Sequence, residues 1–170
     1  HGTPCASNID INDDGTAFEE KVDGTCAILY HDPMTGWCLA TRSVCDADQS
    51  ITVLGERSPW TFRGLFEKAV GSSLDAFAAK FSLRDNLTYV FELCTPLNPV
   101  VVQYEGFNIT LLAVRDRGTG MEFDPRDPAI NHGLPTAPQY LFGSMDELVA
   151  FVSSRSPKDA EGLILKSRLH

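Results

Sequence analysis

The sequence has no long apolar run and few basic residues. Its longest apolar stretches, such as residues 100–102 and 110–114, are strand-sized, whereas a membrane-spanning helix needs about 18 apolar residues in a row. We therefore expect no membrane segment. Lys and Arg number 14 against 23 Asp and Glu, which gives a formal net charge of −9. Without a general basic surface, any nucleic-acid contact must be local, metal-assisted or completed from outside the chain.

Cysteines are few, and they follow no regular spacing. There are 5, an odd number, and no C-x-x-C pair occurs. This argues against both a disulfide framework and a zinc site, because each needs a regular set of cysteines. We therefore expect a reducing, cytoplasmic compartment.

The remaining composition is that of an ordinary globular domain. The chain has 170 residues, of which 43% are hydrophobic, enough for one domain with a core. The first residues are polar and rich in turn formers, so we expect a lead-in at 1–16 and a single domain at 17–170.

Hydrophobic periodicity predicts the α+β class, rich in antiparallel sheet. Strands are expected at 17–22, 25–31, 37–43, 87–94, 99–104, 108–115 and 161–166, and helices at 60–70, 74–81 and from Ser144 onward. A capping box, Ser144 with Glu147, marks the start of the last helix. Residues 117–140, rich in Pro and Gly, predict a long irregular loop.

Four short segments could carry chemistry. They are Lys21-Val22-Asp23-Gly24-Thr25, Ala40-Thr41-Arg42-Ser43, Phe91-Glu92-Leu93 and Glu161-Gly162-Leu163-Ile164-Leu165-Lys166. Each alone has a plain alternative, since a surface lysine beside an Asp-Gly turn or a solvated strand glutamate is common. Their order and spacing together favour the interpretation that the four segments carry a function.

In that order and spacing the segments resemble those of the covalent nucleotidyltransferases, which comprise ATP-dependent DNA and RNA ligases and mRNA capping enzymes. The third segment, continuing as Cys94-Thr95-Pro96-Leu97-Asn98, is most similar to the phage-type RNA ligases. The resemblance implies an antiparallel-rich nucleotidyltransferase (adenylation) domain with a few short helices. It also implies an ATP-dependent RNA ligase that joins a 5′-phosphate RNA end to a 3′-hydroxyl end.

The resemblance implies a role for each matching residue. Lys21 would be the nucleophile that forms a covalent lysyl-AMP with release of pyrophosphate. Glu92 would contact the ribose or a metal, and Glu161 would help to hold the catalytic metal. The remaining nucleotide-binding residues would be Glu20, Asp23, Gly24, Arg42 and Lys166.

The chemistry explains why these residue types are needed. A lysine amine has a reference pKa near 10.4, so little of it is neutral at pH 7. Carboxylates and a triphosphate favour the charged form, so a divalent cation, Mg²⁺ or Mn²⁺, and cationic side chains must offset their field before the amine can attack. Oxygen ligands suit Mg²⁺. A guanidinium such as that of Arg42 can grip a phosphate through two hydrogen bonds.

The chain departs from the family pattern at its end. It stops at His170 without the Lys-x-Lys strand that follows in relatives, so we expect a domain incomplete at its C-terminus and a missing segment or domain. Two alternatives stay open: a DNA ligase or capping-type enzyme with the same lysine chemistry, and a nucleotide- or RNA-binding module without catalysis.

Overall fold

The computed structural model describes residues 16–53, 56–97, 101–156 and 161–167. These residues form two compact units. The central unit comprises residues 22–137, and the terminal unit comprises the described residues up to Lys21 together with those from Pro138 onward. Most of the predicted lead-in lies outside the described residues. The domain boundaries predicted from the sequence stay a prediction.

The central unit is built on a five-stranded sheet in the order β3-β2-β6-β7-β8. Neighbouring strands are antiparallel, with Ala27 of β2 opposite Thr41 of β3 and Phe91 of β6. The strands span Gly36–Thr41 (β3), Thr25–Asp32 (β2), Leu87–Cys94 (β6), Asn108–Asp116 (β7) and Glu122–Phe123 (β8). The hairpin of β2 and β3 confirms the prediction made from the turn between them.

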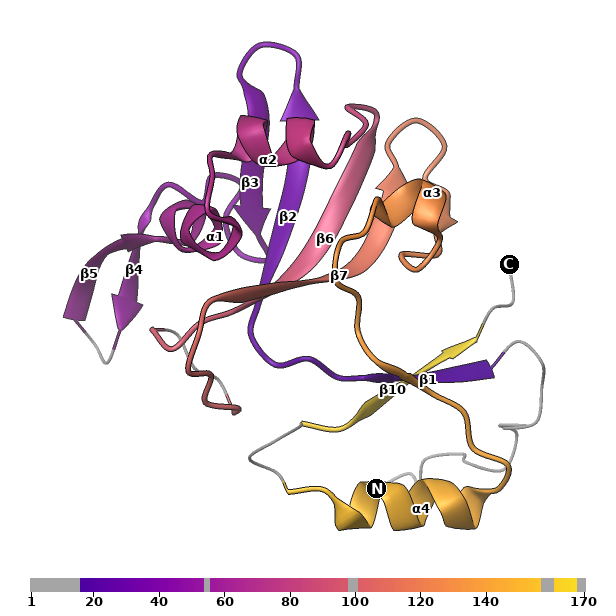
Figure 1. Ribbon diagram of the computed structural model, residues 1–170. Coiled ribbons are helices and arrows are strands. Elements are labelled where there is room, and N and C mark those ends of the chain that lie inside the picture. The colour runs from indigo at the N-terminus through magenta and orange to yellow at the C-terminus, as the bar shows by residue number, and fades with distance from the viewer. Residues whose placement is uncertain (1–15, 54–55, 98–100, 157–160, 168–170) are drawn as a thin grey trace, which may run out of the picture. The chain divides into compact units, whose positions relative to one another are not determined.

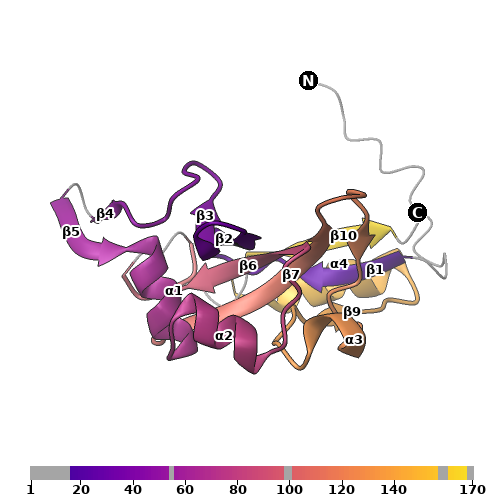
Figure 2. The same cartoon turned by 90° about the horizontal axis from the view of Figure 1, so that it is seen from above.

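Helices α1 (Phe62–Val70) and α2 (Leu74–Lys80) lie along one face of this sheet, as Figures 1 and 2 show. The Thr61 hydroxyl accepts a hydrogen bond from the Gly64 N–H and so caps α1, which begins two residues later than predicted. On this face the rings of Phe66 and Phe91 pack edge to face at 5.5 Å. The core is formed here.

The other face of the sheet is less covered. Because side chains alternate along a strand, the residues next to the buried Ala27 and Phe91 point away from the helices. Cys26, Ile28 and Glu92 lie at these positions and are only partly buried. This face carries two of the residues considered below.

Several short elements were not expected from the sequence. Strands β4 (Ser50–Val53) and β5 (Glu56–Thr61) form a separate two-stranded sheet. The predicted loop 117–140 contains β8, β9 (Gln139–Tyr140) and a four-residue helix, α3 (Pro128–Asn131). Asp127 caps α3, and Pro128 is its first residue. A capping residue followed by proline is typical of a helix start.

The predicted strand at 99–104 is wrong over its described residues, because 101–104 form no strand. The backbone N–H groups of Val101 and Val102 donate instead to a carboxylate oxygen of Asp23. These two hydrogen bonds, to a residue 78 and 79 positions away in sequence, therefore take the place of hydrogen bonds to a neighbouring strand.

The terminal unit is a three-stranded sheet in the order β10-β1-β9, accompanied by one helix. Its elements span Thr16–Glu20 (β1), Leu163–Ser167 (β10) and Met145–Ser154 (α4). The Ser144 hydroxyl accepts from the Glu147 N–H, which confirms the predicted helix start. Phe18 packs edge to face against Phe142, whose ring lies 5.2 Å from that of Phe151 on α4.

The whole is α+β and rich in antiparallel sheet, as predicted. Among the described residues, none of the helices combines the length and apolar character needed to cross a bilayer.

Candidate active site

Lys21 stands at the end of β1, where the strand is held against β10. Its N–H donates to the Gly162 carbonyl at 2.9 Å, one step beyond the last register pair, Glu20 with Leu163. The Lys21 ammonium forms an ion pair with the Glu161 carboxylate. The β1–β10 pairing thus joins two predicted site residues that are 140 positions apart in sequence.

A second ion pair lies on the same sheet. The Lys166 Nζ is 2.8 Å from Glu19 Oε2, and the Glu19 side chain is only 5% exposed. Strand alternation puts Glu19 and Lys21 on one face of β1, and Lys166 lies opposite Ala17 on that face. This part of the terminal unit therefore contains two lysine–carboxylate ion pairs, Lys21 with Glu161 and Lys166 with Glu19. Glu19 was missed from the sequence, because Ala17 and Phe18 before it are both apolar and mark no single buried face.

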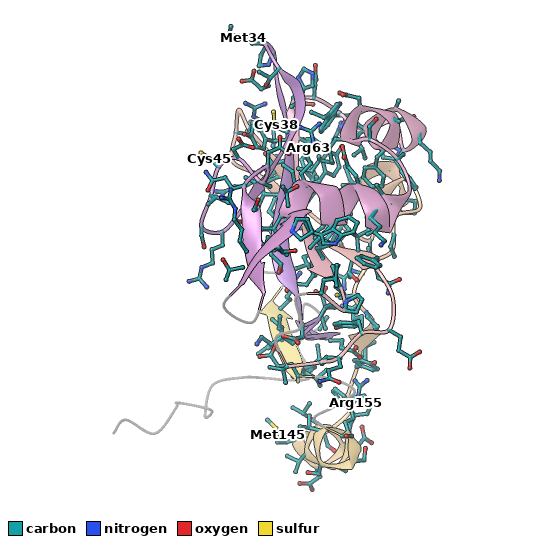
Figure 3. All side chains as sticks on the ribbon, turned by 90° about the vertical axis from the view of Figure 1, so that its left-hand side faces the viewer. Met34, Cys38, Cys45, Arg63, Met145 and Arg155 are labelled. Carbon is teal, nitrogen blue, oxygen red and sulfur yellow. The ribbon has the colours of Figure 1, made fainter. Side chains whose placement is uncertain are left out.

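Glu20 points to the other face of β1. Its carboxylate is 2.8 Å from Arg155 Nη2 and accepts a hydrogen bond from the Tyr140 hydroxyl at 3.0 Å. Figure 3 shows Arg155 on the side of α4 toward these strands. The hydrogen bond to Glu20 raises the pKa of the Arg155 guanidinium. The side chain of Glu20 is thus engaged within the terminal unit, and its backbone N–H donates to the Pro138 carbonyl.

Asp23 holds a loop of the central unit. Its side chain is 4% exposed, and its Oδ2 accepts from the N–H groups of Val101 and Val102, both at 2.6 Å. Charge-assisted bonds of this kind are among the stronger hydrogen bonds in proteins. The Cys94 thiol also donates to the Asp23 carbonyl at 3.5 Å. The structure therefore gives Asp23 an architectural role just after Lys21.

Gly24 is required by the close approach of two backbones. A Cβ at this position would lie 2.5 Å from the Leu93 carbonyl oxygen of β6. No residue with a side chain fits there without a shift of the strand. The Asp-Gly pair of the sequence segment thus fixes the start of β2 against β6.

Arg42 and Glu92 lie near each other in the central unit. Glu92 is opposite Cys26 in the β2–β6 register, and Arg42 follows β3, where Thr41 is opposite Ala27. Burial raises the pKa of the Cys26 thiol, with a further increase from Glu92 and a decrease from Arg42. The two predicted ligands therefore share the less covered face of the sheet.

The predicted site residues are divided between the two units. Those in the terminal unit are Glu20, Lys21, Glu161 and Lys166, and those in the central unit are Asp23, Gly24, Arg42 and Glu92. No group of three or more His, Cys, Asp or Glu side chains is arranged to hold a metal within the described part of the chain. A partly exposed carboxylate such as that of Glu161 suits Mg²⁺, which typically takes one or two protein carboxylates and completes its shell with water and phosphate.

Comparisons with known proteins were made by sequence and by structure. No protein-family model matches the chain. An RNA ligase of Rhodothermus phage RM378 is 36% identical over 99 residues, which cover 56% of this chain and 22% of the phage protein. An archaeal ATP-dependent RNA ligase superposes with a TM-score of 0.61 at 17% identity, over 90% of this chain and 39% of that one. A mutant Naegleria gruberi RNA ligase, solved with ATP and Mn, gives a TM-score of 0.56 at 15% identity, over 89% of this chain and 45% of that one.

These matches agree with one another and with the sequence segments. The chain has the fold of the RNA ligase nucleotidyltransferase domain. The resemblance to RNA ligases predicted from the sequence is confirmed. The chain spans about a fifth of the length of the phage relative and about two fifths of the archaeal one.

Proposed function

We propose that this chain is the adenylation part of an ATP-dependent RNA ligase, with Lys21 as its nucleophile. The observation that carries the proposal is the position of Lys21, which closes β1 and is paired with Glu161 in a fold shared with RNA ligases. A rigid strand end presents the amine in a fixed place, and positioning of this kind is the main contribution a protein makes to phosphoryl-transfer chemistry.

The reaction begins with attack of the neutral Lys21 amine on the α-phosphorus of ATP. A P–N bond forms, the bond from the α-phosphorus to the bridging oxygen breaks, and pyrophosphate leaves while the nitrogen loses its proton. The 5′-phosphate of an RNA then takes the AMP from Lys21. A 3′-hydroxyl displaces AMP in turn, and the two RNA ends are joined.

Glu161 holds the side chain of Lys21 in an ion pair, and this contact must give way before the amine can reach the α-phosphorus. A divalent cation, Mg²⁺ or Mn²⁺, would supply positive charge that stabilises the triphosphate and competes with Lys21 for this carboxylate. Lys166 would offset phosphate charge once ATP is bound. Arg42 and Glu92 would bind the nucleotide, with Glu92 at the ribose or the metal.

The test is intact-mass spectrometry after incubation with ATP and Mg²⁺. We expect a mass gain of one AMP in the wild type and none in Lys21→Arg, which keeps the positive charge but removes the nucleophile. Lys80→Arg is the matched control, since Lys80 ends α2 in the central unit, and it should be labelled as the wild type is. The adduct should be stable to alkali and labile to acid, as a phosphoramide is.

Absence of the adduct from the wild type would refute the ligase proposal and favour a nucleotide- or RNA-binding module. If the adduct forms, sealing assays with nicked RNA and nicked DNA distinguish an RNA ligase from a DNA ligase. A guanylate adduct formed from GTP in place of the AMP adduct would point to capping chemistry. We place the protein in a reducing, cytoplasmic compartment, which the free thiols of Cys26, Cys38, Cys45 and Cys94 support.

A further inference from the structure

Lys68 lies between two aromatic rings at the surface of the central unit. Its Nζ is 4.7 Å from the centre of the Trp60 ring and 4.4 Å from that of Phe107. Three separate elements bring these groups together, since Trp60 belongs to β5, Lys68 to the last turn of α1, and Phe107 directly precedes β7.

The arrangement holds the lysine in place without neutralising it. None of the ion pairs of the described residues involves Lys68, whereas Lys21 and Lys166 both have carboxylate partners. A cation over an aromatic face is attracted by the ring quadrupole, and the ring itself brings no negative charge. In a chain of net charge −9, a fixed lysine without a carboxylate partner is a local positive site.

The rings are anchored but remain partly accessible. Trp60 and Phe107 both pack against the hydrophobic core, and neither is fully buried. The Trp60 ring also lies beside the first turn of α1, since a Cβ built on Gly64 would be 3.8 Å from it. A lysine and two partly buried rings form a small surface that can offer both charge and stacking.

We propose that Trp60, Lys68 and Phe107 form a contact site for single-stranded RNA. Lys68 would contact a phosphate, and the exposed parts of the rings would stack on a base. Single-stranded nucleic acids are typically bound by this combination of cation and aromatic platform. An acidic protein segment would supply the anion but no base, so the two rings favour nucleic acid. The inference rests on the proposed function for the choice of RNA.

Within the central unit, the contact site is separate from Glu92, one of the residues assigned to ATP. Helix α1 packs against the face of the sheet that carries Phe91, whereas Glu92, the next residue, points to the other face. RNA bound at Lys68 would therefore add affinity for the strand without contact to Glu92. The two activities can be measured independently.

Binding of a labelled RNA oligonucleotide of about 12 nucleotides, followed by fluorescence anisotropy, tests the site. We expect Lys68→Ala to weaken binding about fivefold and to lower the slope of log K against log salt by about 1. Trp60→Leu should weaken binding about tenfold through loss of stacking. The matched control is Lys80→Ala, because the Lys80 Nζ also lies over a ring, that of Phe81 at 5.1 Å, and its loss should leave affinity unchanged.

A second measurement reports stacking directly. The chain has two tryptophans, so Trp37→Phe leaves Trp60 as the single indole. RNA should quench its fluorescence, and polyglutamate should not. If the circular dichroism spectrum shows that Trp60→Leu does not fold, Trp60→Phe is used in its place. This variant should bind RNA less tightly than the wild type.

The proposal is overturned if Lys68→Ala and Lys80→Ala weaken RNA binding equally, or if RNA leaves Trp60 emission unchanged. Quenching by polyglutamate equal to that by RNA would assign the surface to an acidic protein instead. Every variant is also assayed for lysyl-AMP. If Lys68→Ala and Trp60→Leu form lysyl-AMP normally and bind RNA as tightly as the wild type, this inference alone is refuted. If the two variants lose RNA affinity but no chain, wild type included, forms lysyl-AMP, the ligase proposal alone is refuted.

Discussion

Among single residues, Gly24 lies so close to β6 that its replacement should lower the stability of the fold. A Cβ there would be 2.5 Å from the Leu93 oxygen, and overpacking of this kind costs about 1–3 kcal/mol. We expect Gly24→Ala to lower the urea midpoint by a corresponding amount. Gly106→Ala is the control, because its Cβ would meet only the Asn108 side chain at 3.7 Å. Equal stability of the two variants would contradict the close approach.

The Cys94 thiol links stability to alkaline pH. Burial raises its pKa from 9.0 to about 11, a hydrogen bond to Tyr104 opposes the change, and Glu92 adds to it. Between these values the unfolded thiol is ionised while the folded one stays protonated, so its contribution is complete below pH 9.0 and is lost as the pH rises toward 11.

We therefore expect the free energy of unfolding to fall by about 1–2 kcal/mol across that range. Urea titrations at about pH 8 and about pH 10.5 measure the change, which Cys94→Ala should reduce. Part of the fall should remain, because burial also raises the pKa of Tyr104. Cys45 is exposed, so the free energy of unfolding of Cys45→Ala should fall with pH as that of the wild type does. A Cys94→Ala variant with the full decline would show that this thiol does not contribute.

The sequence predicted which residues could act, but not how they pair. Lys21 and Glu161 were each identified by resemblance, and only the β1–β10 register brings them together. Neighbouring glutamates were harder to assign. Glu19 is buried against Lys166, while Glu20 faces Arg155, and the run Ala17-Phe18-Glu19-Glu20 has no alternation to say which carboxylate faces which side.

At the scale of elements, the β1–β10 pair depends on a buried charge. Glu19 is 5% exposed, and its partner Lys166 is 34% exposed. Removing one partner of such a pair weakens the compensation of the charge that stays buried. We expect Lys166→Met to cost about 2 kcal/mol, reduced from the value for fully buried pairs because the lysine is partly solvated.

A double-mutant cycle tests this pair. Adding Glu19→Gln to Lys166→Met should restore about half of the lost stability, because it removes the buried charge that Lys166 compensated. Asp48→Asn is the comparison, since Asp48 forms an exposed ion pair with Arg63 and should cost less than about 1 kcal/mol. If Glu19→Gln lowers the stability of the Lys166→Met chain further, the buried pair is not what holds the two strands.

Predicted elements were correct where a local pattern decides the structure. The hairpin turn, the helical spacing after Trp60 and the capping box at Ser144 are all local, and the elements follow them. Residues 101–104 resemble a strand in composition, but the N–H groups of Val101 and Val102 donate to a distant carboxylate, that of Asp23. β5 contains Pro59 within a polar stretch, so neither alternation nor propensity indicated it.

At the scale of the whole molecule, the two units differ in how much apolar surface they bury. Leu29, Phe66 and Phe91 of the central unit are fully buried. Helix α4 of the terminal unit contains no buried residue, and Val149 and Val152 on it are 56% and 46% exposed. Elements with few buried apolar contacts open at a lower free-energy cost.

Hydrogen exchange followed by mass spectrometry should therefore rank the units. We expect amides of α4 to exchange at least about 100-fold faster than those of α1 and β6, a difference of about 2.7 kcal/mol in opening free energy. Lys21 lies in the terminal unit, so its strand should have intermediate protection, with β1 held on both sides by β9 and β10. Equal protection of α4 and α1 would mean that both units open in one cooperative step, and the lesser burial of α4 would then have no energetic consequence.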